Sequence, residues 1–126
     1  MQLLIDTTEQ EKIILAIYSR SKLIRKKTIK VARISERLLP EIAKFMKTAR
    51  ITLRDLDKIL VNPGPGAFSS TRTGVACANA LAFALDIPVL QWPSGKISKV
   101  VLPVYDKEPN ITQPNVKSQI NLSSRA

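Results

Sequence analysis

The sequence predicts an α/β fold built on a mixed β-sheet, with its elements in the order β-β-β-α-β-α-β. Three short runs that contain branched apolar residues open the chain, and brief polar segments separate them, which is typical of an antiparallel meander. The spacing of the apolar residues then changes to three and four, which indicates an amphipathic helix. A turn rich in glycine and proline follows, and it joins an apolar run to an alanine-rich segment, which indicates a strand, a turn and a helix in succession.

The first three strands are expected at residues 2–5, 13–18 and 23–31. The first two runs are almost wholly apolar, whereas the third mixes apolar with basic residues. Polar residues at 9–12 and 21–22 supply the turns between them. Connections this short join antiparallel neighbours, because parallel neighbours need a long crossover.

The first helix is expected over residues 35–50, followed by a short helical turn over residues 52–57 that Thr52 caps. Pro40 lies early in the helix, where a proline is tolerated only near the first turn. The apolar residues that form its stripe are Leu38, Leu39, Ile42, Phe45, Met46 and Ala49.

The fourth strand is expected at residues 58–61, the second helix at residues 70–85 and the fifth strand at residues 87–90. The second helix has small residues on several faces, among them Cys77 and Ala80. Small residues allow either tight packing on the protein's own sheet or the close approach of a second partner from outside. The sequence leaves both readings open.

The turn between the fourth strand and the second helix, residues 62–74, is the most distinctive local feature. Gly64 and Gly66 can adopt backbone angles that other residues avoid, and Ser69, Ser70 and Thr71 are good N-caps for the helix. Such a turn directs backbone N–H groups and a helix dipole at one point, which suits a phosphate. Its spacing matches neither common phosphate-loop motif. A phosphate site and a purely structural turn therefore both remain open.

Composition narrows the function classes. A chain of 126 residues forms one domain, and its single cysteine, Cys77, excludes an internal disulfide and fits a reducing cytoplasm. We expect no membrane-spanning segment, no signal peptide and no cofactor. The chain has no histidine, so a histidine general base is excluded and a zinc site is not expected. Cys77 is interpreted as a small packed apolar residue rather than a nucleophile.

Acidic residues are too few at the expected strand ends for a two-metal site. Asp6 ends the first strand, whereas the neutral Asn62 ends the fourth. Asp55 and Asp57 precede the fourth strand and would lie at its far end. One carboxylate cannot hold two cations near a phosphate, so we expect no metal site and no catalysis by this chain alone.

The net charge of +10 is concentrated between residues 20 and 33, where seven basic residues occur without an acid. Arg25, Lys26 and Lys27 form its centre and are candidate contacts for a nucleic acid. The alternative is a solvated strand edge that lysines protect from aggregation. No aromatic residue is interleaved to stack bases.

Several motifs occur in a fixed order along the chain. They are LLIDTT (residues 3–8), SERLLPEI (35–42), LRDLDKILV (53–61), GPGAFSSTR (64–72), LDIPV (85–89), PVY (103–105) and PNITQP (109–114). In this order they resemble the TsaB (YeaZ) family of the actin-like/RNase H-like superfamily. The glycine turn and the SERLLP segment are specific to the family rather than to the superfamily.

The resemblance implies a single RNase H-like lobe at residues 1–95 and a short extension at residues 96–126 that is similar to the family's C-terminal end. It implies a non-catalytic scaffold that binds a paralogous catalytic subunit, TsaD, and works with the ATPase TsaE in N6-threonylcarbamoyladenosine synthesis at position 37 of tRNA. The two helices would form a four-helix contact with that partner or with a second copy. The interface residues would be Leu38, Leu39, Ile42, Met46, Cys77 and Ala80.

The chain departs from the family's pattern in three places. No histidine precedes the SERLLP segment, and the usual GPGSFTG reads GPGAFSS at residues 64–70. We also expect a short form that lacks most of the second lobe. A nucleotide site would then be vestigial, with Asp6, Thr7, Gly64, Gly66 and Arg72 as its remnants.

Three hypotheses of different classes follow from these observations. The favoured one is a scaffold in a tRNA-modifying complex, with Arg25, Lys26 and Lys27 adding weak electrostatic contact to tRNA. The second is an autonomous nucleotide-binding or ATPase-like protein, against which the missing acids count. The third is an RNA-binding module, against which the missing stacking residues count.

Overall fold

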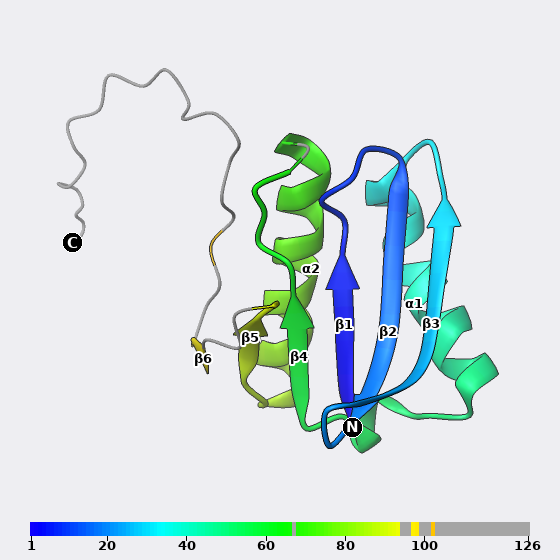
Figure 1. Ribbon diagram of the computed structural model, residues 1–126, viewed down its shortest axis with the longest axis vertical. Helices are drawn as coiled ribbons and strands as arrows, with labels where there is room; N and C mark the ends of the chain where they lie inside the picture. Colours follow the sequence, from blue (N-terminus) through cyan, green and yellow to red (C-terminus); the bar gives the residue numbers. More distant parts are fainter. Residues whose placement is uncertain (67, 94–96, 99–101, 103–126) are drawn as a thin grey trace, which may run out of the picture.

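A mixed β-sheet organises the chain (Figure 1). The computed structural model describes residues 1–66, 68–93, 97–98 and 102. Within these residues the sheet has six strands in the order β3-β2-β1-β4-β5-β6. The strands are β1 (Gln2–Asp6), β2 (Lys12–Ser19), β3 (Lys22–Lys30), β4 (Lys58–Val61), β5 (Val89–Gln91) and β6 (Ile97–Ser98).

The pairing directions confirm the predicted meander followed by two crossovers. β1 pairs antiparallel with β2, and β2 pairs antiparallel with β3, so the first three strands form consecutive hairpins. β1, β4 and β5 are parallel to one another. α1 lies in the connection that leads to β4, and α2 lies in the connection from β4 to β5. The mixed α/β fold class predicted from the sequence is therefore confirmed.

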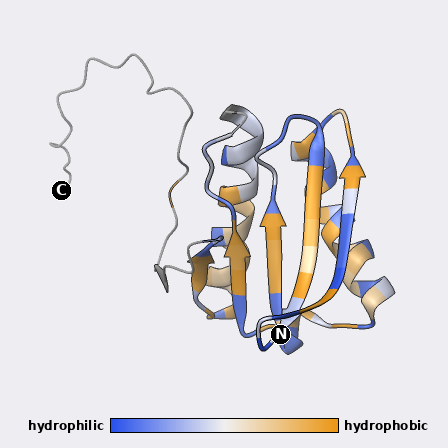
Figure 2. Cartoon of the chain, in the orientation of Figure 1, coloured by the Kyte–Doolittle hydropathy of each residue, from blue (hydrophilic) through white to orange (hydrophobic). Residues whose placement is uncertain are grey.

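The two long helices, α1 (Ile34–Ala49) and α2 (Phe68–Leu85), cover the same face of the sheet. Their inward residues join those of β1, β2, β4 and β5 in one apolar core, and Figure 2 shows the hydrophobic run through the central strands. The fully buried residues at its centre are Leu3, Ile5, Ile13, Leu15, Ile17, Leu38, Ile59, Val61 and Val89.

The other face of the sheet carries a smaller apolar cluster that contains no helix residue. Leu4, Ala16 and Leu60 are buried there. Tyr18 and Trp92 pack beside them, with their ring centroids 5.3 Å apart. Alternation along β1, β2 and β4 thus sends every second side chain to this face.

Most predicted elements, α2 among them, are found within two residues of their expected bounds, but the predicted N-caps of α2 are corrected. α2 begins at Phe68, so Ser69, Ser70 and Thr71 lie inside its first turn and do not cap it. The N–H groups in the first turn of a helix have no partner within the helix, so hydroxyl residues are favourable both at the N-cap and in the first turn. The sequence alone therefore could not tell an N-cap residue from a first-turn residue.

The first helix and its exit also differ in detail from expectation. Pro40 is the seventh residue of α1, beyond the first turn, and the helix continues through it to Ala49. Arg50 then adopts a left-handed conformation (φ 58°) and its backbone N–H bonds to the carbonyl oxygens of Lys47 and Met46. The predicted cap is confirmed, because Thr52 and Asp55 form a capping box around the short 3-10 helix η1 (Leu53–Asp55).

Two further expectations concern the ends of the chain. The predicted division at residue 95 is not tested, because residues 96–126 lie outside the described residues apart from 97, 98 and 102. The PVY and PNITQP motifs fall in the same undescribed part. Within the described residues, no helix is long and apolar enough to cross a membrane.

Candidate functional site

The outer faces of α1 and α2 expose large apolar side chains that the sheet does not cover. On α1, Leu39 is 58% exposed, and on α2, Phe83 is 90% exposed. Leu53 of η1, which follows α1, is also exposed. Single exposed apolar residues are ordinary on protein surfaces, but a group on two neighbouring helices indicates an interaction site.

An apolar groove of about 430 Å³ opens between the two helices and η1. Leu39 and Ala43 of α1 form one wall, and Leu81 of α2 and Leu53 form the other parts of its rim. Ile42 and Met46 line it from below and are themselves buried in the core. The groove can therefore accept an apolar side chain or helix edge from a partner without any change in the core.

The structure corrects half of the predicted interface. Leu38, Ile42 and Met46 are only 2–4% exposed, so they face the protein's own sheet rather than a partner. The apolar stripe of an amphipathic helix packs first on its own core, and the sequence pattern does not tell core from interface. Of the α1 residues predicted, Leu39 alone lies on the surface, although Ile42 and Met46 reach the base of the groove.

On α2 the predicted interface residues are more accessible. Ala80 is exposed and Cys77 is half-buried. Partial burial raises the pKa of the Cys77 thiol to about 11, so it stays a neutral thiol at physiological pH. This agrees with its interpretation as a small packed residue.

Phe83 was not among the predicted interface residues, although it is the most exposed large apolar side chain among the described residues. Residues three and four apart share a face of a helix. Phe83 therefore lies on the same side as Ala80, and the outer face of α2 also exposes Ala76 and Ala84. The sequence signal that could have identified Phe83 was its position three residues after Ala80, on a helix face that otherwise carries small residues.

The glycine turn brings together most of the residues predicted as a vestigial phosphate site. Asp6 and Thr7 lie at the end of β1, beside the end of β4 and the turn that holds Gly64 and Gly66. A Cβ on Gly66 would approach the carbonyl oxygen of Thr8 to 2.5 Å, so only glycine fits there. Arg72 lies one turn into α2 and is exposed.

The polar groups of this turn are engaged within the protein. The Asp6 carboxylate accepts hydrogen bonds from the Thr8 N–H (2.9 Å), the Thr8 hydroxyl (2.7 Å) and the Asn62 amide (3.2 Å). The buried Thr7 hydroxyl donates to the Ser70 carbonyl oxygen at 2.6 Å. Asn62 in turn accepts a hydrogen bond from the N–H of Gly64, whose φ is 103°. These contacts favour the structural reading of the turn.

A second cavity, of about 600 Å³, lies between the first turns of α1 and α2 and the β1–β2 connection. Ser35, Ser69, Ser70 and Thr73 contribute to its lining. Within the part of the chain that the structure describes, no three histidine, cysteine or acidic side chains are grouped to hold a metal ion. Besides these hydroxyl groups, the lining contains one carboxylate, Glu11, and one cation, Arg33, so the cavity offers mainly hydrogen-bonding groups.

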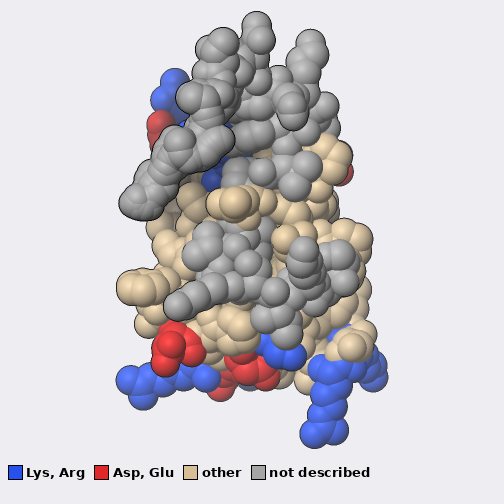
Figure 3. Space-filling view, turned by 90° about the vertical axis from the view of Figure 1, so that its left-hand side faces the viewer, with Lys and Arg blue, Asp and Glu red and all other residues tan. Residues whose placement is uncertain are grey.

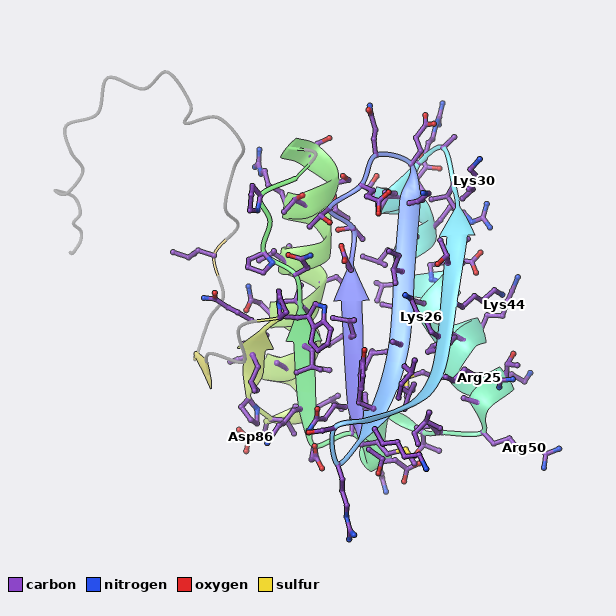
Figure 4. All side chains as sticks on the ribbon, viewed as in Figure 1. Arg25, Lys26, Lys30, Lys44, Arg50 and Asp86 are labelled. Carbon is purple, nitrogen blue, oxygen red and sulfur yellow. The ribbon has the colours of Figure 1, made fainter. Side chains whose placement is uncertain are left out.

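The three predicted nucleic-acid contacts fall on two different faces. β3 is an edge strand, and the register pairs Lys27 with Leu15 and Lys26 with Ala16. Leu15 belongs to the helix-covered core, whereas Ala16 belongs to the opposite cluster. Lys27 and Arg25 therefore lie on the α1 side, and Figure 4 shows Lys26 in front of the sheet.

Beneath this edge lies a buried carboxylate. Glu41 of α1 is 4% exposed and accepts a hydrogen bond from the Arg37 guanidinium at 2.6 Å. That bond holds the pKa of Glu41 below its ordinary value of 4.5, against the opposing effect of burial, and the charges of Lys44 and Lys27 act in the same direction as Arg37. Glu41 is thus ionised and surrounded by cations.

The pairing of Glu41 predicts an acid-dependent loss of stability. Because its pKa is lower in the folded state, the ionised carboxylate stabilises the fold above the unfolded pKa, and this contribution disappears as the pH falls through the folded pKa. Urea unfolding between about pH 6 and about pH 2.5 should show a smaller acid-induced loss in Glu41→Gln than in the wild type. Glu36→Gln is the control, since Glu36 pairs with Arg33 on the surface and its side chain is 64% exposed. If Glu41→Gln and Glu36→Gln lost the same amount of stability between about pH 6 and about pH 2.5, the stabilising role of ionised Glu41 would be contradicted.

The sequence matches one protein-family model and is similar to named proteins of tRNA modification. Residues 28–97 match the family model described as TsaD: tRNA N6-adenosine threonylcarbamoyltransferase. The chain is 38% identical over 74 residues to the tRNA threonylcarbamoyladenosine biosynthesis protein TsaB of Buchnera aphidicola subsp. Schizaphis graminum, a match that covers 58% of this chain and 32% of the relative. It is 46% identical over 54 residues to the tRNA N6-adenosine threonylcarbamoyltransferase of Nitrosospira multiformis, covering 43% of this chain and 16% of the relative.

The fold is also similar to a solved structure. YeaZ from Pseudomonas aeruginosa superimposes with a TM-score of 0.64 at 30% sequence identity, over 71% of this chain and 43% of that one. The matches span less than half the length of each of these relatives.

Proposed function

Because the chain belongs to the TsaD family of tRNA N6-adenosine threonylcarbamoyltransferases, we propose that it is a scaffold subunit that binds a paralogous catalytic subunit of TsaD type. Its predicted likeness to TsaB (YeaZ) is confirmed by the named relatives and by the similar YeaZ structure. On this proposal the chain supports N6-threonylcarbamoyladenosine synthesis on tRNA in the cytoplasm, together with a TsaE-like ATPase.

The observation that carries the proposal is the apolar surface of the two helices. The groove walled by Leu39 and Leu81 offers a hollow to another pair of helices, and the exposed Phe83 adds an apolar side chain elsewhere on the outer side of α2. Helix pairs associate by placing ridges of one into grooves of the other. Ala80 and the neighbouring alanines permit close approach.

The same surface supports self-association when the catalytic partner is absent. A second copy would offer the identical groove and the identical Phe83, as a two-fold interface requires. The homodimer and the complex with the catalytic subunit then compete for one surface. Adding partner should therefore convert homodimer into heterodimer.

The experiment that tests the proposal is a titration of the chain with the TsaD-type transferase of the same organism. Size-exclusion chromatography with light scattering should show a complex that contains one copy of each subunit. Isothermal titration calorimetry supplies the affinity. No complex at about 50 μM of each protein, where an interface of even micromolar Kd would be occupied, would refute the scaffold proposal.

We further infer that the chain does not itself perform the chemistry. Asp6, the carboxylate at the end of β1, is held by Thr8 and Asn62, and the Thr7 hydroxyl is held by Ser70. These groups are occupied in stabilising the glycine turn, and a ligand would have to displace the contacts. The proposal therefore assigns the turn a structural role.

This assignment predicts negligible nucleotide binding by the chain alone. Calorimetry with ATP and Mg²⁺ up to about 1 mM should give no saturating heat, and ATP hydrolysis should not exceed the uncatalysed background. The alternative, an ATPase-like protein, would bind its nucleotide beside Asp6 and the glycine turn. Tight Mg²⁺-dependent binding that Asp6→Asn abolishes would replace the scaffold by that alternative.

A further inference from the structure

A concentration of cations lies along the edge of the sheet formed by β3 and the neighbouring side of α1. All of β3 is exposed except the half-buried Ile29. In Figure 4 the labelled side chains of Arg25, Lys44 and Arg50 project from this edge. The opposite edge, seen in Figure 3, shows largely uncharged described side chains across its middle, with mixed charges mainly at its lower end.

Four of these cations form a group that we call the basic seam: Arg25 and Lys27 of β3 with Arg37 and Lys44 of α1. Glu41 accepts a hydrogen bond from Arg37, and the charges of Lys27 and Lys44 also act on its carboxylate. One buried carboxylate thus faces three cations, and the seam keeps an excess of positive charge. The bond to Glu41 holds the Arg37 guanidinium in place, which reduces the entropy that this side chain loses on binding a ligand.

Arg25 is held by a separate contact. Its Nη1 donates a hydrogen bond of 3.1 Å to the carbonyl oxygen of Thr48, near the end of α1. A small cavity of about 140 Å³ lies at this point, lined by Phe45 and Thr48 of α1 and by residues 25–27 of β3. A guanidinium has five N–H donors, so a single bond to Thr48 leaves it able to engage an anion as well.

We propose that the basic seam binds the phosphodiester backbone of RNA, and that it does so on one face of β3 rather than along the whole strand. The arrangement joins cations from two elements over one buried carboxylate, with Arg25 already oriented. This inference uses the proposed function only to select tRNA as the RNA of interest. It removes Lys26 from the predicted contacts, because Lys26 lies on the other face of the sheet.

The composition of the seam favours RNA over an acidic protein. Protein interfaces depend on buried apolar and aromatic anchors, whereas phosphate contacts need only cations and tolerate solvent. Residues 25–27 of β3 are all cationic, and the strand's exposed apolar residues, Leu23 and Ile24, precede them. A lysine edge that serves only to prevent aggregation would not require the hydrogen bonds that Arg37 makes to Glu41 and Arg25 makes to Thr48.

The experiment compares two double variants of equal charge on the same strand. Arg25→Gln with Lys27→Gln changes the seam, and Lys26→Gln with Lys30→Gln changes the opposite face. Binding of the full chain to an unmodified tRNA transcript is measured by fluorescence anisotropy from about 50 to 300 mM salt. Circular dichroism verifies that both variants are folded.

We expect the seam variant to weaken tRNA binding by about tenfold or more at about 0.1 M salt and to lower the salt slope by about 1.4 to 1.8 units, for two lost phosphate contacts. The matched variant should change the affinity by less than about threefold. Equal losses in both variants, or no loss in the seam variant, would overturn the proposal. Displacement of the tRNA by polyglutamate at equal charge would also overturn it, in favour of an acidic protein.

The two proposals fail separately. The seam variant leaves Leu39, Phe83 and the helix groove unchanged, so its binding to the TsaD-type subunit should equal that of the wild type. If the wild type binds tRNA through the seam but forms no complex with the transferase, the scaffold proposal fails and the seam stands. If the complex forms and the seam variant binds tRNA as the wild type does, the seam proposal fails and the scaffold proposal stands.

Discussion

Phe83→Asp is expected to weaken binding to the TsaD-type catalytic subunit by about 100-fold or more while leaving the fold intact. Phe83 is 90% exposed in the isolated chain, so it contributes little to the core and its replacement costs little stability. In a helix–helix interface the ring would be buried, which contributes roughly 1.5–3 kcal/mol. The aspartate forfeits that contribution and adds the cost of burying an unpaired charge.

The measurement is a calorimetric titration of each variant with the transferase, alongside light scattering for self-association. Leu23→Asp is the matched control, because Leu23 is an exposed apolar residue on β3, away from the helix face. Ala80→Arg tests the same face by adding bulk and charge where alanine permits close approach. Unchanged partner binding in both Phe83→Asp and Ala80→Arg would show that the interface lies elsewhere, and an equal loss in Leu23→Asp would deny the helix face any special role.

The fold was predictable because local patterns and tertiary demands agree along the chain. Runs such as residues 13–18 are apolar and branched enough to form buried strands, and the stripe of α1 has a clear helical period. The left-handed conformation of Arg50, which ends α1, and the β6 strand were not foreseen. The first is adopted by a residue that is not glycine, and the second is an edge pairing only two residues long.

The candidate site was predicted less well, for reasons that depend on tertiary structure. Periodicity identified the apolar stripe of α1 but not which neighbour it faces, so Leu38 was placed on the surface. Lys26 was grouped with Lys27, although alternation along a strand separates them. Asp6 looked available for a ligand, because its bonds to Thr8 and Asn62 depend on the approach of β1 and the glycine turn.

The contact between the β1 end and α2 leads to the second prediction with a large effect, on stability. A Cβ added to Gly74 would overlap the Thr7 hydroxyl oxygen and would lie 3.2 Å from the Thr7 Cβ. That hydroxyl is buried and donates its hydrogen bond to the Ser70 carbonyl oxygen. Gly74 is therefore required by the close approach of α2 to β1, not by its own backbone angles.

Gly74→Ala should destabilise the fold by about 2–3 kcal/mol, although alanine in a helix interior is favoured over glycine by roughly 1 kcal/mol. Either the helix moves away from β1 or the Thr7 hydroxyl rotates and loses its buried partner. In thermal unfolding the Tm should fall by about 8 °C or more. In the background Thr7→Ala, where the obstructing oxygen is gone, the same Gly74→Ala change should be nearly neutral or stabilising. Equal destabilisation in both backgrounds would mean that Gly74 is not coupled to Thr7, and that the tight docking of α2 on β1 rests on other contacts.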